Sequence, residues 1–142
     1  MDSADFSGIW KSTFGYTSSV HPGEFTFEHY SRIHRKGNTL VIESLPGSES
    51  YRLTRVVLDG RVATGTWEQH NTAEGKHEGI IYHGAIQLIL DEDGKAMRGL
   101  WIGFDRNMKV KSGPWEITYV GAGLPEGAEI SKMTHSPSSD DR

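Results

Sequence analysis

The stretch YHGAIQLILDEDGKAMRGLWIGF, residues 82–104, decides the fold because it holds two runs of β-forming residues separated by a short polar turn. The turn DEDGK at 91–95 contains an Asp-Gly step, and glycine tolerates the positive φ that tight turns require. Two strands joined by such a turn are antiparallel neighbours. This part of the chain is therefore predicted to form a β-hairpin.

The same alternation of strand and turn continues in both directions along the chain. Turn sequences such as RKGN at 35–38 and LDGR at 58–61 end the other runs. The predicted strands cover residues 7–17, 24–34, 39–45, 50–58, 62–70, 79–90, 96–104 and 110–120. No connection leaves room for a crossover helix, and a closed sheet has no exposed edges. The sequence therefore predicts an all-β fold, an eight-stranded up-and-down antiparallel barrel.

The length of 142 residues fits one domain that buries about two thirds of the surface of its unfolded chain. We expect the barrel, a ligand-binding domain, to occupy residues 1–122. Residues 123–142 are rich in Gly, Pro, Ser and acidic side chains. This C-terminal tail is predicted to form a short helix at 125–133 followed by a disordered end.

The composition excludes several classes of function. The chain has no cysteine, so disulfides, thiolate zinc sites and cysteine nucleophiles are excluded. A net charge of -4 gives no overall attraction to a nucleic-acid polymer or an anionic membrane. The start MDSADFSGIWKS lacks the basic and apolar regions of a signal peptide, which predicts a cytoplasmic protein.

Strand alternation assigns side chains to the inside or the outside of the barrel. In 79–90, Tyr82 belongs to the apolar inward stripe, and His83 lies on the other face. That other face is also rich in apolar residues, so His83 belongs either to a half-covered outer wall or to a site at a mouth, at an interface or under the C-terminal segment. The strand 96–104 is apolar on both faces. Since only one face of a barrel strand points into the lumen, the other apolar face is expected to be covered by another segment or surface.

The opening FSGIWKSTF, residues 6–14, resembles the start of calycin barrels, which include lipocalins, fatty-acid-binding proteins and avidins. The resemblance implies a calycin-like fold in which the tryptophan of Gly-x-Trp closes one barrel end.

Phrases across residues 23–120, GEFTFEHYSRI, VATGTWEQ, IIYHGAIQL, MRGLWIGF and SGPWEITYV, resemble a C-terminal domain of actinobacterial helix-turn-helix regulators. That resemblance implies a bacterial ligand-sensing or partner-binding module. No helix-turn-helix segment accompanies these phrases, so DNA binding is not implied. Residues 82–104 are also similar to small β-barrel receptors for cyclic nucleotides in antiphage signalling, which implies a nucleotide second messenger.

A lumen lined by aromatic rings suits a flat ligand, because ring faces stack on bases and other ring systems. The alternative is that the same rings only fill the core. We expect ligand contacts from Phe27, His29, Tyr30, Tyr51, Arg55, Trp67, Tyr82, His83 and Trp101. Both Arg52 and Arg55 could bind a phosphate or carboxylate, although solvent exposure is the expectation for each.

No nucleophile elbow, zinc-protease, phosphate-loop or dinucleotide motif occurs in the chain. The sequence therefore predicts a small-molecule sensor or sequestering protein that needs no cofactor, acting on a second copy or an effector domain. One alternative is a small enzyme, a cyclase or isomerase, that uses His29, Glu43 or His83 as acid and base. The other is a ligand-free dimerisation module. The set His70, Glu74, His77 and Glu78 is not expected to hold a physiological metal.

Overall fold

The computed structural model describes residues 6–17, 24–46, 50–71, 81–104 and 107–136 of the chain. All regular secondary structure in this part of the chain is β-strand. The strands are β1 (Ile9–Thr17), β2 (Glu24–Lys36), β3 (Thr39–Ser44), β4 (Ser50–Asp59), β5 (Val62–Asn71), β6 (Ile81–Leu90), β7 (Ala96–Phe104), β8 (Val110–Gly121) and β9 (Ser131–Ser136).

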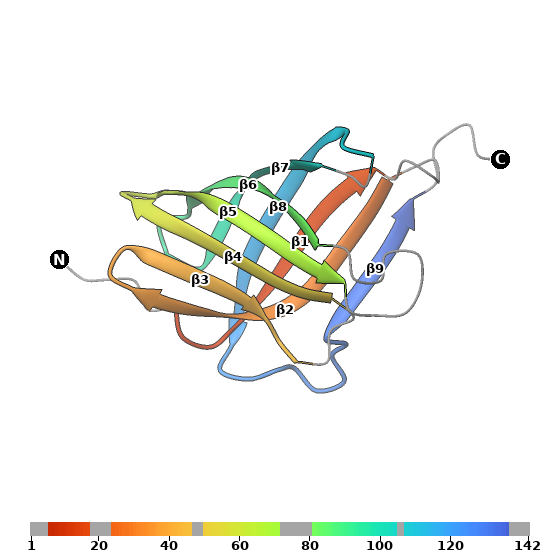
Figure 1. Ribbon diagram of the computed structural model, residues 1–142. Coiled ribbons are helices and arrows are strands. Elements are labelled where there is room, and N and C mark those ends of the chain that lie inside the picture. Colours follow the sequence, from red (N-terminus) through yellow and green to blue (C-terminus); the bar gives the residue numbers. More distant parts are fainter. Residues whose placement is uncertain (1–5, 18–23, 47–49, 72–80, 105–106, 137–142) are drawn as a thin grey trace.

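Strands β1 to β8 form a closed antiparallel barrel (Figure 1). Each strand pairs with the next in sequence, and β8 pairs with β1 to close the ring. Glycines with positive φ lie in the tight connections, as Gly60 (φ 63°) does between β4 and β5. The predicted eight-stranded up-and-down barrel is therefore confirmed, and the architecture is consistent with a calycin-like fold.

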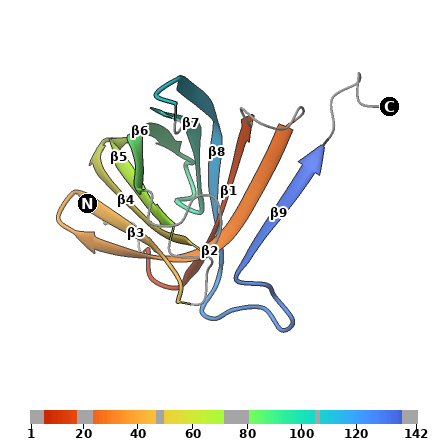
Figure 2. The same cartoon turned by 45° about the vertical axis from the view of Figure 1, so that its right-hand side comes forward.

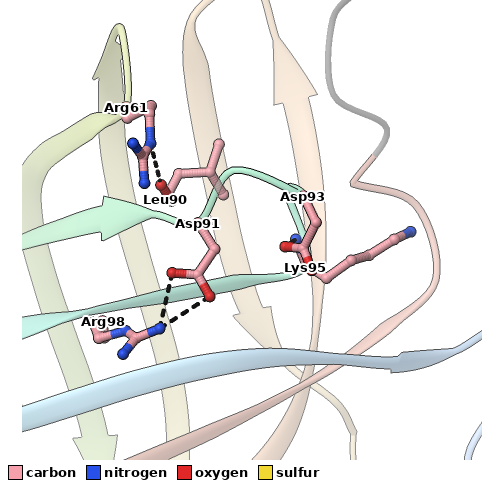
Figure 3. Close-up of polar contacts among 6 residues, drawn as sticks. All are labelled: Arg61, Leu90, Asp91, Asp93, Lys95 and Arg98. Carbon is pink, nitrogen blue, oxygen red and sulfur yellow. Dashed lines mark hydrogen bonds and ion pairs between the residues drawn. The ribbon is translucent and has the colours of Figure 1, made fainter.

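The predicted hairpin at 82–104 is the pair β6–β7, and its turn is held by side chains (Figure 3). The Nη2 group of Arg98 donates to both carboxylate oxygens of Asp91, at 2.9 and 3.0 Å. The Nε group of Arg61 donates to the carbonyl oxygen of Leu90 at 2.7 Å and ties this turn to the turn between β4 and β5. The backbone of Lys95 donates to Asp93 Oδ1 within the turn, at 2.9 Å.

The C-terminal segment differs from the prediction, because it adds a strand where a helix was expected. β9 pairs antiparallel with residues 24–29 of β2 and stands outside the ring of eight strands (Figure 2). β2 is longer than β3, which covers only residues 31–36 of the same edge. β9 therefore satisfies backbone groups of β2 that β3 does not reach. The prediction of a helix at 125–133 was wrong, because the unpaired edge of β2 draws the end of this segment into a strand.

One end of the barrel is closed by Trp10, which is fully buried. Its indole Nε1–H donates to the carbonyl oxygen of Phe6 at 3.0 Å. The ring of Tyr119 meets Trp10 edge to face, with centroids 5.4 Å apart. This is the position that the calycin resemblance implied for the tryptophan. The ring of Phe6 also packs against Trp10, with centroids 5.8 Å apart. The same core cluster includes the aliphatic side chains of Leu40, Val56, Leu58, Ala63, Leu88, Leu90 and Ile117, together with Met97.

Candidate functional site

The far half of the lumen, meaning the half away from Trp10, contains two tryptophans that lie flat against the barrel wall. The first is Trp67 on β5, which lies over Gly84 on β6 and Gly103 on β7. Its Nε1–H donates to the carbonyl oxygen of Ile102 at 3.2 Å. A Cβ atom added at Gly103 would lie 2.6 Å from Trp67 Cζ2, so only glycine leaves room for this ring.

The second tryptophan repeats the arrangement two strands further round the barrel. Trp101 on β7 lies over Gly113 on β8 and reaches β1, where its Nε1–H donates to the carbonyl oxygen of Gly15 at 3.0 Å. A Cβ atom at Gly113 would lie 3.0 Å from Trp101 Nε1. In both cases a tryptophan spans a glycine on the next strand and bonds to the backbone of the strand after it.

The angle between the two indole planes supports this placement. Two strands of eight make a quarter of the circumference, so rings lying along the wall at these positions should be perpendicular. The planes of Trp67 and Trp101 meet at 89°, with centroids 5.7 Å apart. The two rings therefore contact each other edge to face in the far half of the lumen.

A patch of polar side chains lies beside these rings on β1, β2 and β8. Ser12 and His29 are directly opposite each other across the β1–β2 pair, which places their Cβ atoms about 5 Å apart. Ser31 shares the inward face of β2 with His29 and lies nearer the closed end, directly opposite Trp10 across the β1–β2 pair. The hydroxyls of Ser12 and Ser31 and the Nδ1 atom of His29 are buried without a hydrogen-bond partner. Each such buried group costs about 1–3 kcal/mol if nothing pairs with it.

Trp115 adds a fourth polar atom of the same kind. Its ring centroid lies 5.0 Å from that of Phe14, the residue two positions beyond Ser12 on β1. The indole Nε1–H of Trp115 is buried without a partner, whereas those of Trp10, Trp67 and Trp101 all donate to backbone carbonyls. We name the group of Ser12, His29, Ser31 and Trp115 the lumen polar patch.

Arg52 on β4 brings a positive charge into the same space. Its side chain is 4% exposed, and the guanidinium carbon lies 4.1 Å from the ring centroid of Phe27. The Nε–H group donates to Gln69 Oε1 at 2.9 Å, and the backbone N–H donates to Ser44 Oγ. β3 ends at Ser44, so the Arg52 side chain lies where the wall between β2 and β4 lacks a strand. The expectation that Arg52 is solvent exposed was wrong.

The electrostatics of the patch follow from this burial. The pKa of His29 lies well below its usual 6.5, first because burial disfavours the imidazolium and second because Arg52 is positively charged. His29 is therefore neutral near neutral pH, and its ring carries one nitrogen donor and one nitrogen acceptor.

The structure brings together part of the predicted ligand-contact set. Phe27, His29, Trp67, Tyr82 and Trp101 share the inward face of their strands. Strand alternation places the remaining four, Tyr30, Tyr51, Arg55 and His83, on the outer face.

Tyr51 and His83 show the surroundings of the predicted contact residues that lie on the outer face of the barrel. The Tyr51 hydroxyl donates to Glu43 Oε2 at 2.7 Å, and this hydrogen bond is the largest of the causes that raise the pKa of Tyr51 to about 12. His83 is exposed on the outer face, so it does not line the lumen. Since Glu43 and His83 both lie outside, they cannot serve as the acid–base partners of His29 inside the lumen.

Sequence reasoning missed Ser12, Ser31 and Trp115 as site residues. Small hydroxyls on a mixed strand carry no pattern of their own, and the pairing of Ser12 with His29 depends on the register of two strands. The available signal was strand alternation, which places Ser12 on the same face as Trp10 and Ser31 on the same face as His29.

The set His70, Glu74, His77 and Glu78 was not expected to hold a physiological metal, and the structure describes only His70 of these four residues. His77, Glu74 and Glu78 lie outside the described residues, and His70 Nε2 lies 3.4 Å from Glu68 Oε1. Within the described ranges, no group of three His, Cys, Asp or Glu side chains is arranged to hold a metal ion.

Comparison of the chain with protein families, curated proteins and solved structures found no match. Among the described residues, no helix has the length and apolar character needed to cross a membrane. The resemblances to actinobacterial regulators and to antiphage receptors therefore stay predictions.

Proposed function

We propose that this protein is a non-catalytic binding protein that holds a small ring-containing molecule in the far half of the barrel lumen. The observation that carries this proposal is the lumen polar patch, four buried polar atoms without partners on adjoining strands. A ligand with polar groups would satisfy these atoms and would recover part of the cost of burying them.

The aromatic wall fits the rest of such a ligand. The rings of Trp67 and Trp101 are perpendicular and contact each other edge to face on the inward side of β5 and β7. Stacking on an aromatic side chain contributes about 1–3 kcal/mol for each ring of a ligand. A nucleobase or another flat heterocycle combines a stacking face with polar edges, so nucleotide-like ligands, including cyclic nucleotides, belong in the first screen.

A thermal-shift screen tests the proposal. Nucleotides, cyclic nucleotides, flavins, haem and lipophilic ring compounds are added to the purified chain, and a ligand that binds only the folded state raises the Tm. The shift should be lost in Trp67→Ala and kept in Val57→Ala, since Val57 is 54% exposed on the outer face. No shift with any class, or an equal shift in both variants, would refute lumen binding.

A second function, dimerisation, is favoured by a separate observation on the outer face of β7 and β8. Leu100, Ile102, Phe104 and Val110 form an exposed apolar ridge, with exposed fractions of 65%, 47%, 48% and 62%. Beside this outer ridge runs a groove of about 500 Å³ lined by residues that include Gly15, Gly99 and Pro114. A two-fold axis between ridge and groove would place each ridge in the groove of a second copy.

Light scattering distinguishes the two states of the chain. If the ridge is the interface, the wild type is a dimer and Ile102→Asp is a monomer, whereas Val57→Asp stays dimeric. A monomeric wild type at high micromolar concentration would rule out dimerisation through this face.

A further inference from the structure

The outward side of β7 and β8 carries an uncharged, exposed surface (Figure 1). Cross-strand pairs arrange its side chains in three successive rows, Leu100 with Pro114, Ile102 with Ser112, and Phe104 with Val110. None of these six residues is charged, although charged residues make up 24% of the chain. The cores of protein–protein interfaces are depleted of charged residues in the same way. This surface therefore has the composition of an interface core.

The two ends of this surface differ in shape. At one end, the groove beside the outer ridge is lined by Leu100, Pro114 and Gly15, among other residues. Gly15 has no side chain, and a Cβ atom added there would lie 3.4 Å from Pro114 Cγ. At the other end, the side chains of Phe104 and Val110 are 48% and 62% exposed. One end is therefore hollow, and the other presents large apolar groups.

The spacing of the rows makes the surface complementary to itself. A strand advances about 3.3 Å per residue, so Leu100 and Phe104 each lie about 7 Å from Ile102, on opposite sides of it. A two-fold axis that passes Ile102 and runs across the strands exchanges the hollow end with the apolar end. Phe104 and Val110 of each copy then lie over the groove of the other copy, and no net clash of charges arises between the rows.

We propose that the outer ridge binds a second copy of this chain about this axis, with Ile102 at the axis and Phe104 as the main side chain over the partner's groove. This inference rests on the dimerisation proposed above as a second function, and it adds the axis and the contacts. Because the two-fold operation repeats every contact, the burial of Phe104 occurs twice in each dimer. Removal of this apolar surface from water stabilises the complex.

Cysteine crosslinking locates the axis, since the chain has no cysteine of its own. Ser112 pairs with Ile102, so the two thiols of a Ser112→Cys dimer face each other across the axis. Facing sheets pack about 10 Å apart, and a short bismaleimide spans this separation. In Glu116→Cys, four residues further along β8, each thiol lies about 13 Å from the axis, and the two thiols are about 26 Å apart.

The crosslinking reaction is run at a concentration at which light scattering shows a dimer. Ser112→Cys should then give a covalent dimer on a denaturing gel, whereas Glu116→Cys should run as a monomer. Both positions are exposed, and labelling with a monofunctional maleimide checks that both thiols react.

A substitution at the apolar end tests the contact itself. Phe104→Gln should weaken the dimer Kd on the order of tenfold, because an apolar side chain at the centre of the contact is lost twice. Ile89→Gln is the matched control, since Ile89 is 45% exposed but lies on β6, outside the three rows. Sedimentation measures both constants, and an unchanged Kd in Phe104→Gln would contradict the contact.

The outcomes separate this inference from the function on which it rests. A wild-type chain that stays monomeric at high micromolar concentration would overturn both. A dimer in which Ser112→Cys is not crosslinked, or in which Glu116→Cys is crosslinked equally well, would overturn the axis and leave dimerisation standing.

Discussion

Arg52 on β4 and His29 on β2 lie inside the barrel against the same two phenylalanine rings. The guanidinium carbon of Arg52 is 5.1 Å from the ring centroid of Phe14, and the imidazole centroid of His29 is 6.2 Å from it. Phe27 contacts both groups as well. The barrel thus holds a buried cation next to a titratable ring, and the ring of His29 lies opposite the unpaired hydroxyl of Ser12.

This arrangement predicts that acid destabilises the fold through His29. The pKa of His29 is lower in the folded state than in the unfolded state, so the unfolded chain binds more protons once the pH falls below about 6.5. The free energy of unfolding should be constant above that pH and should fall as the pH drops below it. Urea denaturation between pH 5 and pH 8 measures the slope.

The His29→Gln variant should show a shallower slope below pH 6.5, because glutamine does not titrate. His34→Gln is the matched control, since the His34 side chain is 63% exposed and lies on the outer face of the same strand. Identical slopes for His29→Gln and wild type would contradict the role assigned to His29.

The lumen polar patch predicts opposite effects on stability and on binding. Ser12→Ala removes a buried hydroxyl that has no partner, so the free energy of unfolding should rise by about 1 kcal/mol in the absence of ligand. The same change should weaken ligand binding, because the ligand loses a hydrogen bond. Ser112→Ala, at an exposed position on β8, should change neither quantity. A less stable Ser12→Ala protein would show that the hydroxyl is satisfied within the fold.

The position of Trp67 depends on Gly103. In Gly103→Ala the new Cβ atom would lie 2.6 Å from Trp67 Cζ2, so the indole must leave the wall. The expected cost is about 1–3 kcal/mol of unfolding free energy, together with a change in tryptophan fluorescence. Gly123→Ala is the control, because its Cβ would meet nothing within 4 Å. An unchanged fluorescence spectrum in Gly103→Ala would show that the ring does not lie over this glycine.

The two ends of the lumen should respond differently to loss of a tryptophan. Trp10→Ala removes a fully buried ring from the closed end and should lower the free energy of unfolding by about 3–5 kcal/mol. Trp67 is only half-buried, so Trp67→Ala should cost less stability but abolish the ligand-induced rise in Tm. Denaturation curves and thermal shifts measured on both variants check this division. Equal losses of stability would contradict it.

The barrel fold could be predicted from the amino-acid sequence. Turn residues such as those at 91–95 and the alternation in 79–90 are local features. Period-two alternation places Tyr82 and His83 on opposite faces, and the more apolar stripe that contains Tyr82 marked the inward face. For the same reason Phe27, His29, Trp67 and Trp101 could be assigned to the lumen.

Two features depended on contacts between distant segments. In YRLTRVVL, residues 51–58, both faces of the strand mix polar and apolar residues, so the pattern did not show that Arg52 points inward and Tyr51 outward; closure of the ring decided it. β9 formed a strand because the longer β2 offered an edge that β3 leaves unpaired.

The chain by itself therefore determined which residues line a wall, because side-chain alternation is a property of each strand. Only the tertiary structure decided which of those residues meet. The pairing of Ser12 with His29, and the position of Arg52 near His29, depend on the register of strands that are separate in sequence, and that register is set by closure of the barrel.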